Sequence, residues 1–200
     1  MEIFKRLTES PEIDSFANRF RCSTITEFPP ATMRGSISQV FYKCYELESV
    51  GPLNTDECTI AALAFGYCYN LKSVELTALT GGSAVSTFQH CYKLQNVVIG
   101  SIGANISFAW SPLLTLDSAK TICTALVSYA GGTHTITLPE EAVALLDGEA
   151  NTAPGDVSWR QYIQDKGWTL IVKTEEDALI TAAEETTEVD NTIIGDGTLA

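Results

Sequence analysis

The sequence repeats one phrase three times, first as Phe41-Tyr-Lys-Cys44-Tyr-Glu-Leu47-Glu-Ser-Val50, then as Phe65-Gly-Tyr-Cys68-Tyr-Asn-Leu71-Lys-Ser-Val74, and finally as Phe88-Gln-His-Cys91-Tyr-Lys-Leu94-Gln-Asn-Val97. The pattern F-x-x-C-Y-x-L-x-x-V returns after 24 and then 23 positions. A period of this size is typical of a solenoid, in which each unit buries its apolar face by stacking on its neighbours.

Two weaker copies flank the three clear ones. Upstream, Cys22 takes the position of the repeated cysteine, and Arg19 stands where the leading Phe is expected. Downstream, Phe108 is kept and Ser111 replaces the cysteine. End copies of a solenoid meet water or a cap, so atypical end copies are expected. The repeat array is therefore predicted to span residues 21–116.

The end of each phrase alternates apolar and polar residues, as in Leu71-Lys-Ser-Val74-Glu-Leu76. Such alternation is typical of a half-buried strand. Stacking one short strand per repeat makes a parallel sheet. The predicted interior residues are Phe65, Leu71, Val74, Phe88, Leu94 and Val97.

Residues 117–172 are predicted to form helix-strand units that continue the same sheet and close its end. The first helix has Asp117 and Ser118 as candidate caps and Gly131-Gly132 as its expected stop. The remaining predicted elements are a strand at 133–139, helices at 140–146 and 157–167, and a strand at 168–172. The expected fold class is thus α/β, a leucine-rich-repeat-like solenoid with a short parallel strand per coil.

The two ends of the chain have their own character. Residues 1–20 mix apolar and charged side chains and are expected to form an amino-terminal cap or docking segment. Residues 173–200 carry one lysine against eight acidic residues. One interpretation of this acidic tail is a solvated end. The other is a segment that orders against a neighbouring subunit through its apolar residues, which are Val189, Ile193, Ile194 and Leu199.

Charge narrows the range of partners. The formal net charge is -13, with only twelve Lys and Arg residues. Nucleic acid and anionic membrane surfaces attract clustered positive charge, so neither is an expected partner. No apolar run approaches the roughly 20 residues of a membrane span. The first residues lack the apolar core of a secretory signal, which predicts synthesis in a cytosol.

The six cysteines are expected to be reduced. Cys22, Cys44, Cys68 and Cys91 share one repeat position, where a thiol packs as a small apolar group. A cytosol also favours reduced thiols. A disulfide framework and a metal site are the alternatives, but zinc sites need close cysteine pairs, which this sequence lacks. No metal or cofactor is expected.

Candidate catalytic residues are few. His90 occupies a repeat position filled elsewhere by Lys43, Tyr67 and Trp110, which predicts an exposed coil surface. His134 is expected to be an ordinary exposed strand residue. Neither histidine has the matched nucleophile that covalent catalysis needs, so no enzyme activity is expected.

Tyr45, Tyr69 and Tyr92 follow the three repeated cysteines. Stacked repeats would place these side chains about 4.8 Å apart, at the strand spacing. A packing column that covers the coil corner is one interpretation. The other is an aromatic strip that recognises a glycan or a protein.

The repeated phrase resembles the degenerate leucine-rich repeats of the BspA-like bacterial surface family, in which an aromatic residue and a cysteine precede a leucine and a short strand. The segment Lys166-Gly-Trp-Thr-Leu170 resembles the closing part of repeat proteins encoded in phage tail and gut-bacterial surface genes. These resemblances imply a non-enzymatic interaction protein, either a tail- or fibre-associated phage virion component or a bacterial adhesin. Expected partners are other virion or surface proteins, further copies of the chain, or a host glycan or receptor.

Overall fold

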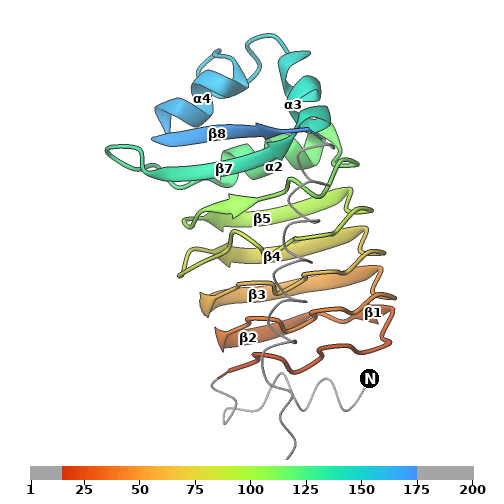
Figure 1. Ribbon diagram of the computed structural model, residues 1–200. Helices are drawn as coiled ribbons and strands as arrows, with labels where there is room; N and C mark the ends of the chain where they lie inside the picture. Colours follow the sequence, from red (N-terminus) through yellow and green to blue (C-terminus); the bar gives the residue numbers. More distant parts are fainter. Residues whose placement is uncertain (1–14, 175–200) are drawn as a thin grey trace, which may run out of the picture.

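The computed structural model describes residues 15–174, which form a mixed α/β structure with parallel strands in two sheets (Figure 1). The five-stranded sheet contains β1 (Glu27–Phe28), β2 (Ala31–Ser36), β3 (Ser49–Ile60), β4 (Ser73–Leu79) and β5 (Asn96–Ile102). The three-stranded sheet contains β6 (Ile106–Ser107), β7 (His134–Pro139) and β8 (Trp168–Lys173). The helices are α2 (Leu116–Ala125), α3 (Glu140–Asp147) and α4 (Trp159–Asp165).

The strands of the larger sheet pair in the register of the repeated phrase. Val50 of β3 pairs with Val74 of β4, and Val74 pairs with Val97 of β5. Their side chains are buried because alternate strand residues face the interior. The pairing of β3 with β4 shifts in register between Val50 and Leu53, at Gly51 and Pro52, since proline cannot donate to the ladder.

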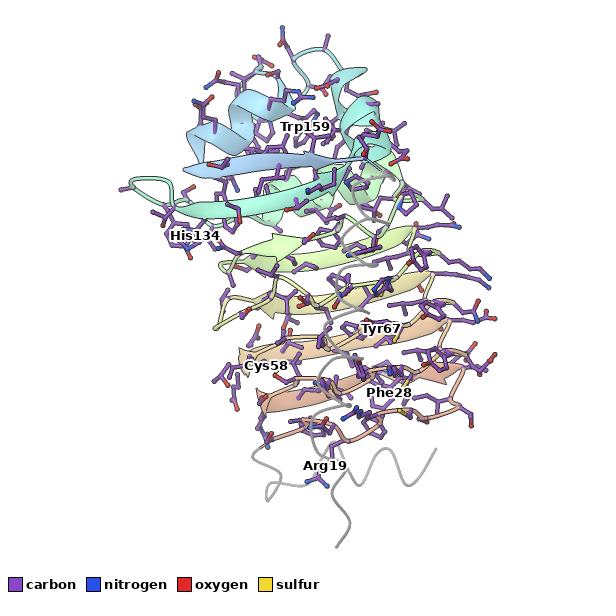
Figure 2. All side chains as sticks on the ribbon, viewed as in Figure 1. Arg19, Phe28, Cys58, Tyr67, His134 and Trp159 are labelled. Carbon is purple, nitrogen blue, oxygen red and sulfur yellow. The ribbon has the colours of Figure 1, made fainter. Side chains whose placement is uncertain are left out.

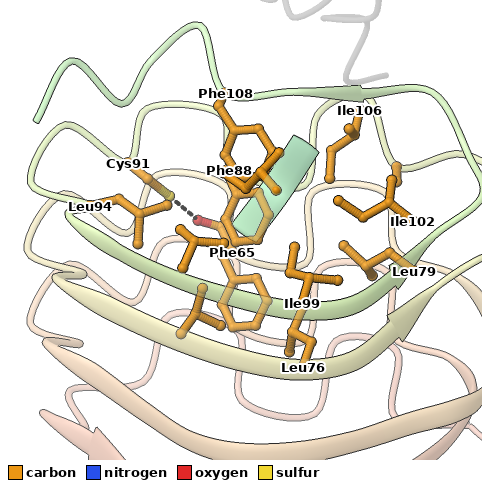
Figure 3. Packing of buried hydrophobic residues seen from close by; sticks show 14 of the residues in the cluster. Phe65, Leu76, Leu79, Phe88, Cys91, Leu94, Ile99, Ile102, Ile106 and Phe108 are labelled. Carbon is orange, nitrogen blue, oxygen red and sulfur yellow. Dashed lines mark hydrogen bonds between the residues drawn. The ribbon is translucent and has the colours of Figure 1, made fainter. Parts of the chain in front are cut away.

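A column of phenylalanine rings fills the interior beside these strands (Figure 3). Phe41, Phe65, Phe88 and Phe108 stack with ring centroids 5.4, 5.5 and 5.0 Å apart. Figure 3 labels the last three of these rings. All four side chains are fully buried, and burial of each contributes about 1.5–3 kcal/mol. The six predicted interior residues are all buried, which confirms the predicted core.

The upstream copy is placed differently from the prediction. Phe20, one residue after Arg19, is the leading phenylalanine, and its ring stacks on Phe41 at 5.5 Å. The N–H of Cys22 donates to the carbonyl of Tyr42, as Lys43 donates to that of Gly66. Cys22 therefore aligns with Lys43 and is exposed, so its predicted register is wrong.

The displacement of Cys22 from its predicted position has a local cause, because the upstream copy is one residue shorter than the others. Phe28 still pairs with Val50, although Phe20 and Phe28 are eight residues apart and Phe41 and Val50 are nine. Ser23 thereby takes the position of Cys44, with its N–H donating to the carbonyl of Phe20.

Helix α2 begins and ends elsewhere than predicted. Thr115 is its N-cap and accepts from the N–H of Ser118, whereas the Ser118 hydroxyl bonds to β5. The helix ends at Ala125, well before Gly131. Leu126 pairs with Ile102 of β5, and the N–H of Val127 donates to the Ile102 carbonyl at 2.8 Å. Pairing with β5 thus overrides the helical pattern of this segment.

The prediction that the carboxyl-terminal strands continue the larger sheet is wrong, because these strands form a separate sheet. Strand β7 pairs with β6, which follows the segment that returns from β5, and β8 pairs with β7. The place beside β5 is taken by α2. The second sheet instead continues the stack formed by the turns that contain the repeated phenylalanines, because the N–H of Phe108 donates to the carbonyl of Thr137 in β7.

Helices α3 and α4 lie at the end of the structure opposite Arg19 (Figure 2). Trp159 and Ile163 of α4 are buried in the common core. Gly167 stops α4 with a φ of +80°, and a Cβ there would collide with the Tyr129 carbonyl oxygen. This glycine therefore permits the sharp turn into β8.

Candidate interaction surface

The tyrosines that follow the repeated cysteines form an exposed column. Tyr45 and Tyr69 stack with centroids 5.3 Å apart, and Tyr69 and Tyr92 follow at 5.9 Å. Each cysteine points into the core, so the next side chain points to solvent, and the three tyrosines are 37–44% exposed. The predicted stack is confirmed, at a spacing slightly wider than that of the strands.

A second aromatic column runs beside the first. Tyr42 contacts Tyr67 at 5.3 Å, Tyr67 contacts His90 at 4.3 Å, and His90 contacts Trp110 at 4.1 Å between ring centroids. The two columns touch where Tyr67 meets Tyr69 and where Tyr92 meets Trp110. We call the seven rings of both columns the aromatic wall; Figure 2 labels Tyr67 on it.

His90 is the buried centre of this wall, and not the exposed residue that its varied repeat position predicted. Only 5% of His90 is exposed, because Tyr67 and Trp110 cover its two sides. Its Nδ1 and the Tyr92 hydroxyl are joined by a hydrogen bond of 2.7 Å. Burial lowers the pKa of His90 to about 4. The imidazole is therefore neutral at pH 7 and ties the two columns together.

Two cations lie over the wall at the end formed by the first repeats. The Arg21 guanidinium is 5.0 Å from the centroid of the Tyr42 ring, and the Lys43 ammonium is 5.3 Å from it. Lys43 also lies 5.7 Å from the Tyr67 centroid. Cations at these distances are attracted by the negative faces of the rings. The wall is thus aromatic along its length and positively charged at one end.

The orientation of the outer tyrosines determines which groups a partner meets. Tyr45, Tyr69 and Tyr92 stack with interplanar angles of 21° and 29°, so each ring covers much of its neighbour's face. Burial raises the pKa of Tyr69 and Tyr92, so both hydroxyls are protonated at pH 7. A partner therefore meets ring edges and hydroxyl groups. Such a surface suits polypeptide contacts, which combine apolar and hydrogen-bonding groups.

His134 is also less exposed than predicted. Its ring stacks on Tyr129 with centroids 3.8 Å apart, and its Nδ1 is buried without a hydrogen-bond partner among residues 15–174. The side chain borders an open groove of about 300 Å³ between the turn at Gly82 and the loop at Asn105. Figure 2 places His134 at the other side of the molecule from Tyr67, so the two histidines form no common site.

The cysteines do not form a binding site in the described part of the chain. All six are unpaired; Cys44, Cys68, Cys91 and Cys123 are buried, and Cys58 is half-buried. No group of three or more His, Cys, Asp or Glu side chains within residues 15–174 is placed to hold a metal ion. Within the same residues, no helix has both the length and the hydropathy needed to cross a bilayer.

The structure describes only some of the predicted interaction residues. Val189, Ile193, Ile194 and Leu199 lie outside the described residues. The prediction included the outer tyrosine column but missed Tyr42, Tyr67 and Trp110 as members of the same surface. Their signal was present as aromatic residues one or two positions after a repeated phenylalanine. It was missed because His90 and Lys43 interrupt that pattern.

Comparisons of the chain with protein-family models, with curated proteins and with solved structures give no match.

Proposed function

We propose that the chain is a non-enzymatic interaction protein that binds other proteins through the aromatic wall. In this proposal the fold is a leucine-rich-repeat-like solenoid of the BspA-like type, and the protein is a tail- or fibre-associated component of a phage virion. Its partners would be other virion proteins, further copies of the chain, or a host surface receptor. The protein would be made in the host cytoplasm and would act in the assembled particle.

The observation that carries the binding role is the contiguity of the seven rings. Tyr45, Tyr69 and Tyr92 expose large side chains side by side, although burial of such side chains is strongly favoured. Tyrosine, tryptophan and arginine are enriched among residues that dominate binding energy at protein interfaces. The wall is also held rigid by its own stacking, so little side-chain entropy is lost on binding.

The interior supports the same proposal. The phenylalanine column and the inward-facing strand residues fill the interior of the repeat region, and their side chains are buried. The repeat region therefore offers a partner its outer surface, which extends over several layers. An extended surface of this kind fits another folded protein or a polypeptide segment better than a small substrate.

The virion assignment rests on the resemblance of the repeated phrase and of the Lys166-Gly-Trp-Thr-Leu170 segment to proteins of phage tails and bacterial surfaces. The alternative from the same resemblance is a bacterial cell-surface adhesin. Both alternatives use the aromatic wall as the binding surface, and they differ in where the protein is found.

The test uses purified particles of a phage that carries the gene. Mass spectrometry should find the wild-type chain in the particles, and a triple variant Tyr45→Ser/Tyr69→Ser/Tyr92→Ser should be incorporated about tenfold less or should slow host attachment to that extent. The control variant Val85→Ser/Val98→Ser/Leu113→Ser changes three equally exposed apolar residues outside the wall and should behave as wild type.

Two results would contradict the proposal. Equal loss in the control and tyrosine variants would show that the wall has no special role. Absence of the chain from particles, with antibody labelling on intact host cells, would favour the adhesin.

A further inference from the structure

We propose that the acidic segment 175–200 of this chain binds the aromatic wall of its own fold, with Arg21 and Lys43 as the cations that receive it. The inference goes beyond the proposed function and does not require it, because it concerns a contact within one isolated molecule.

The segment and the wall are complementary in charge. Residues 175–200 contain eight Asp or Glu residues and no Lys or Arg. Within residues 15–174, the cations in ion pairs are Arg34, Lys72, Lys120 and Arg160. No carboxylate of those same residues lies at ion-pair distance from Arg21 or Lys43. Arg19, Lys93, Lys166 and Lys173 likewise stand in no ion pair within those residues, but Arg21 and Lys43 are the cations of this group that lie over rings of the aromatic wall. In a protein of net charge -13, the wall thus offers two cations to another acidic group.

The side chains of Arg21 and Lys43 are also held in place. Both lie over the Tyr42 ring, so less conformational freedom is lost when a carboxylate approaches them. A cation beside an aromatic ring can pair with a carboxylate while the ring contacts apolar side chains of the same segment. The segment has these residues in Val189, Ile193 and Ile194.

The segment leaves the fold at the end of β8. Lys173, the last residue of β8, pairs with Pro139 of β7. The N–H of Phe108 donates to the Thr137 carbonyl, which places Phe108 opposite Leu138 and Ala109 opposite Pro139. The chain therefore leaves β8 at the register position of Ala109, the residue before Trp110, with β7 between the two layers. Trp110 is the last ring of the inner column.

The segment is long enough to reach Arg21. Six layer spacings separate β8 from the layer of Phe20, which is roughly 29 Å at 4.8 Å per layer. The 26 residues after Thr174 span at most about 86 Å when extended. The segment can therefore follow the wall from Trp110 to Arg21 with length to spare, and no second copy is needed.

The experiment is hydrogen–deuterium exchange, followed by mass spectrometry, on the full chain and its variants. At low salt, amides of residues 175–200 should exchange at least about tenfold more slowly than in an unstructured peptide of the same sequence. The variant Arg21→Glu/Lys43→Glu should lose this protection. So should the wild type in high salt, because screening weakens exposed ion pairs.

The control variant Arg34→Glu/Arg160→Glu changes the net charge equally at two exposed ion pairs outside the wall and should keep the protection. Protection of β3–β5 in every sample verifies that the variants are folded.

Three results would overturn the inference. These are unprotected amides in the wild-type segment, equal protection in the Arg21→Glu/Lys43→Glu variant, and protection that increases with protein concentration. The last result would identify a second copy as the source of the bound segment.

Discussion

The Sγ of Cys91 donates a hydrogen bond to the carbonyl oxygen of Phe65, one repeat earlier, at 3.1 Å (Figure 3). Cys68 donates to Phe41 and Cys44 donates to Phe20 in the same way. The repeated cysteine therefore joins adjacent layers through a polar contact, in addition to packing as a small apolar group.

Ser111 breaks this series, which gives a matched pair of substitutions. It occupies the cysteine position, but its buried hydroxyl has no partner among residues 15–174. A carbon–oxygen bond is shorter than a carbon–sulfur bond, so the hydroxyl falls short of the carbonyl in the layer below. Ser111→Cys should stabilise the protein by about 1 kcal/mol, and Cys91→Ser should destabilise it by about 1–3 kcal/mol. Urea unfolding measures both, and effects of the same sign would contradict this explanation.

Leu71 tests the packing of the core. Its side chain is fully buried in the layer of Phe65, so Leu71→Ala should lower the free energy of unfolding by about 2–5 kcal/mol, from lost transfer energy and the remaining cavity. Leu113 is half exposed and serves as the control, with an expected change within about 0.5 kcal/mol for Leu113→Ala. A loss below about 1 kcal/mol at Leu71, measured by denaturant unfolding, would argue against the described core.

His90 should make the stability depend on pH. Its pKa is about 4 in the folded protein and near 6.5 when unfolded, so the unfolded state binds more protons between these values. The stabilising contribution is complete above pH 6.5 and is lost as the pH falls toward 4, by at most about 1.4 kcal/mol per pH unit.

The variant His90→Phe isolates that contribution, because it keeps an aromatic ring and removes the titrating group. Thermal unfolding from pH 7 to pH 4.5 should show a steeper loss of stability in wild type than in the variant. Parallel curves would show that His90 stays accessible to protons in the folded state.

Thiol reactivity should separate Cys22 from the other cysteines. Burial raises the pKa of Cys44 to about 11 and that of Cys58 and Cys123 to about 12, and it also raises the pKa of Cys68 and Cys91. Thiolates react and thiols do not, so only exposed Cys22 should be modified quickly at pH 8.

Titration under denaturing, non-reducing conditions should then find six free thiols. A count of two or fewer would mean that the cysteines are paired in disulfides.

The sequence predicted the repeated layers well because one phrase places Phe65, Leu71 and Val74 at equivalent points of each copy. It failed where a single residue or a distant contact decides the outcome. The missing residue between Phe20 and Phe28 moved Cys22 out of register. The burial of His90 depends on Trp110, a side chain in the next layer.

The carboxyl-terminal part shows the same limit. The elements at residues 134–139, 140–147 and 168–173 were predicted nearly in place, because their apolar spacing is local. Their assignment to the larger sheet was wrong, because that depends on which edge each strand meets. The segment after Ala125 extends only because Ile102 supplies its backbone partner.

The helix beside β5 also decides how copies of this protein can aggregate. The Ser118 hydroxyl of α2 accepts from the N–H of Val97 and donates to the carbonyl of Gln95, so it occupies groups that an incoming strand would use. Unpaired strand edges are templates for edge-to-edge polymerisation, and a covering helix removes that hazard at β5. Within residues 15–174, β8 pairs only with β7, and it bears the exposed side chains of Ile171 and Val172. Edge-to-edge pairing between copies at this end of the fold therefore has to begin at β8.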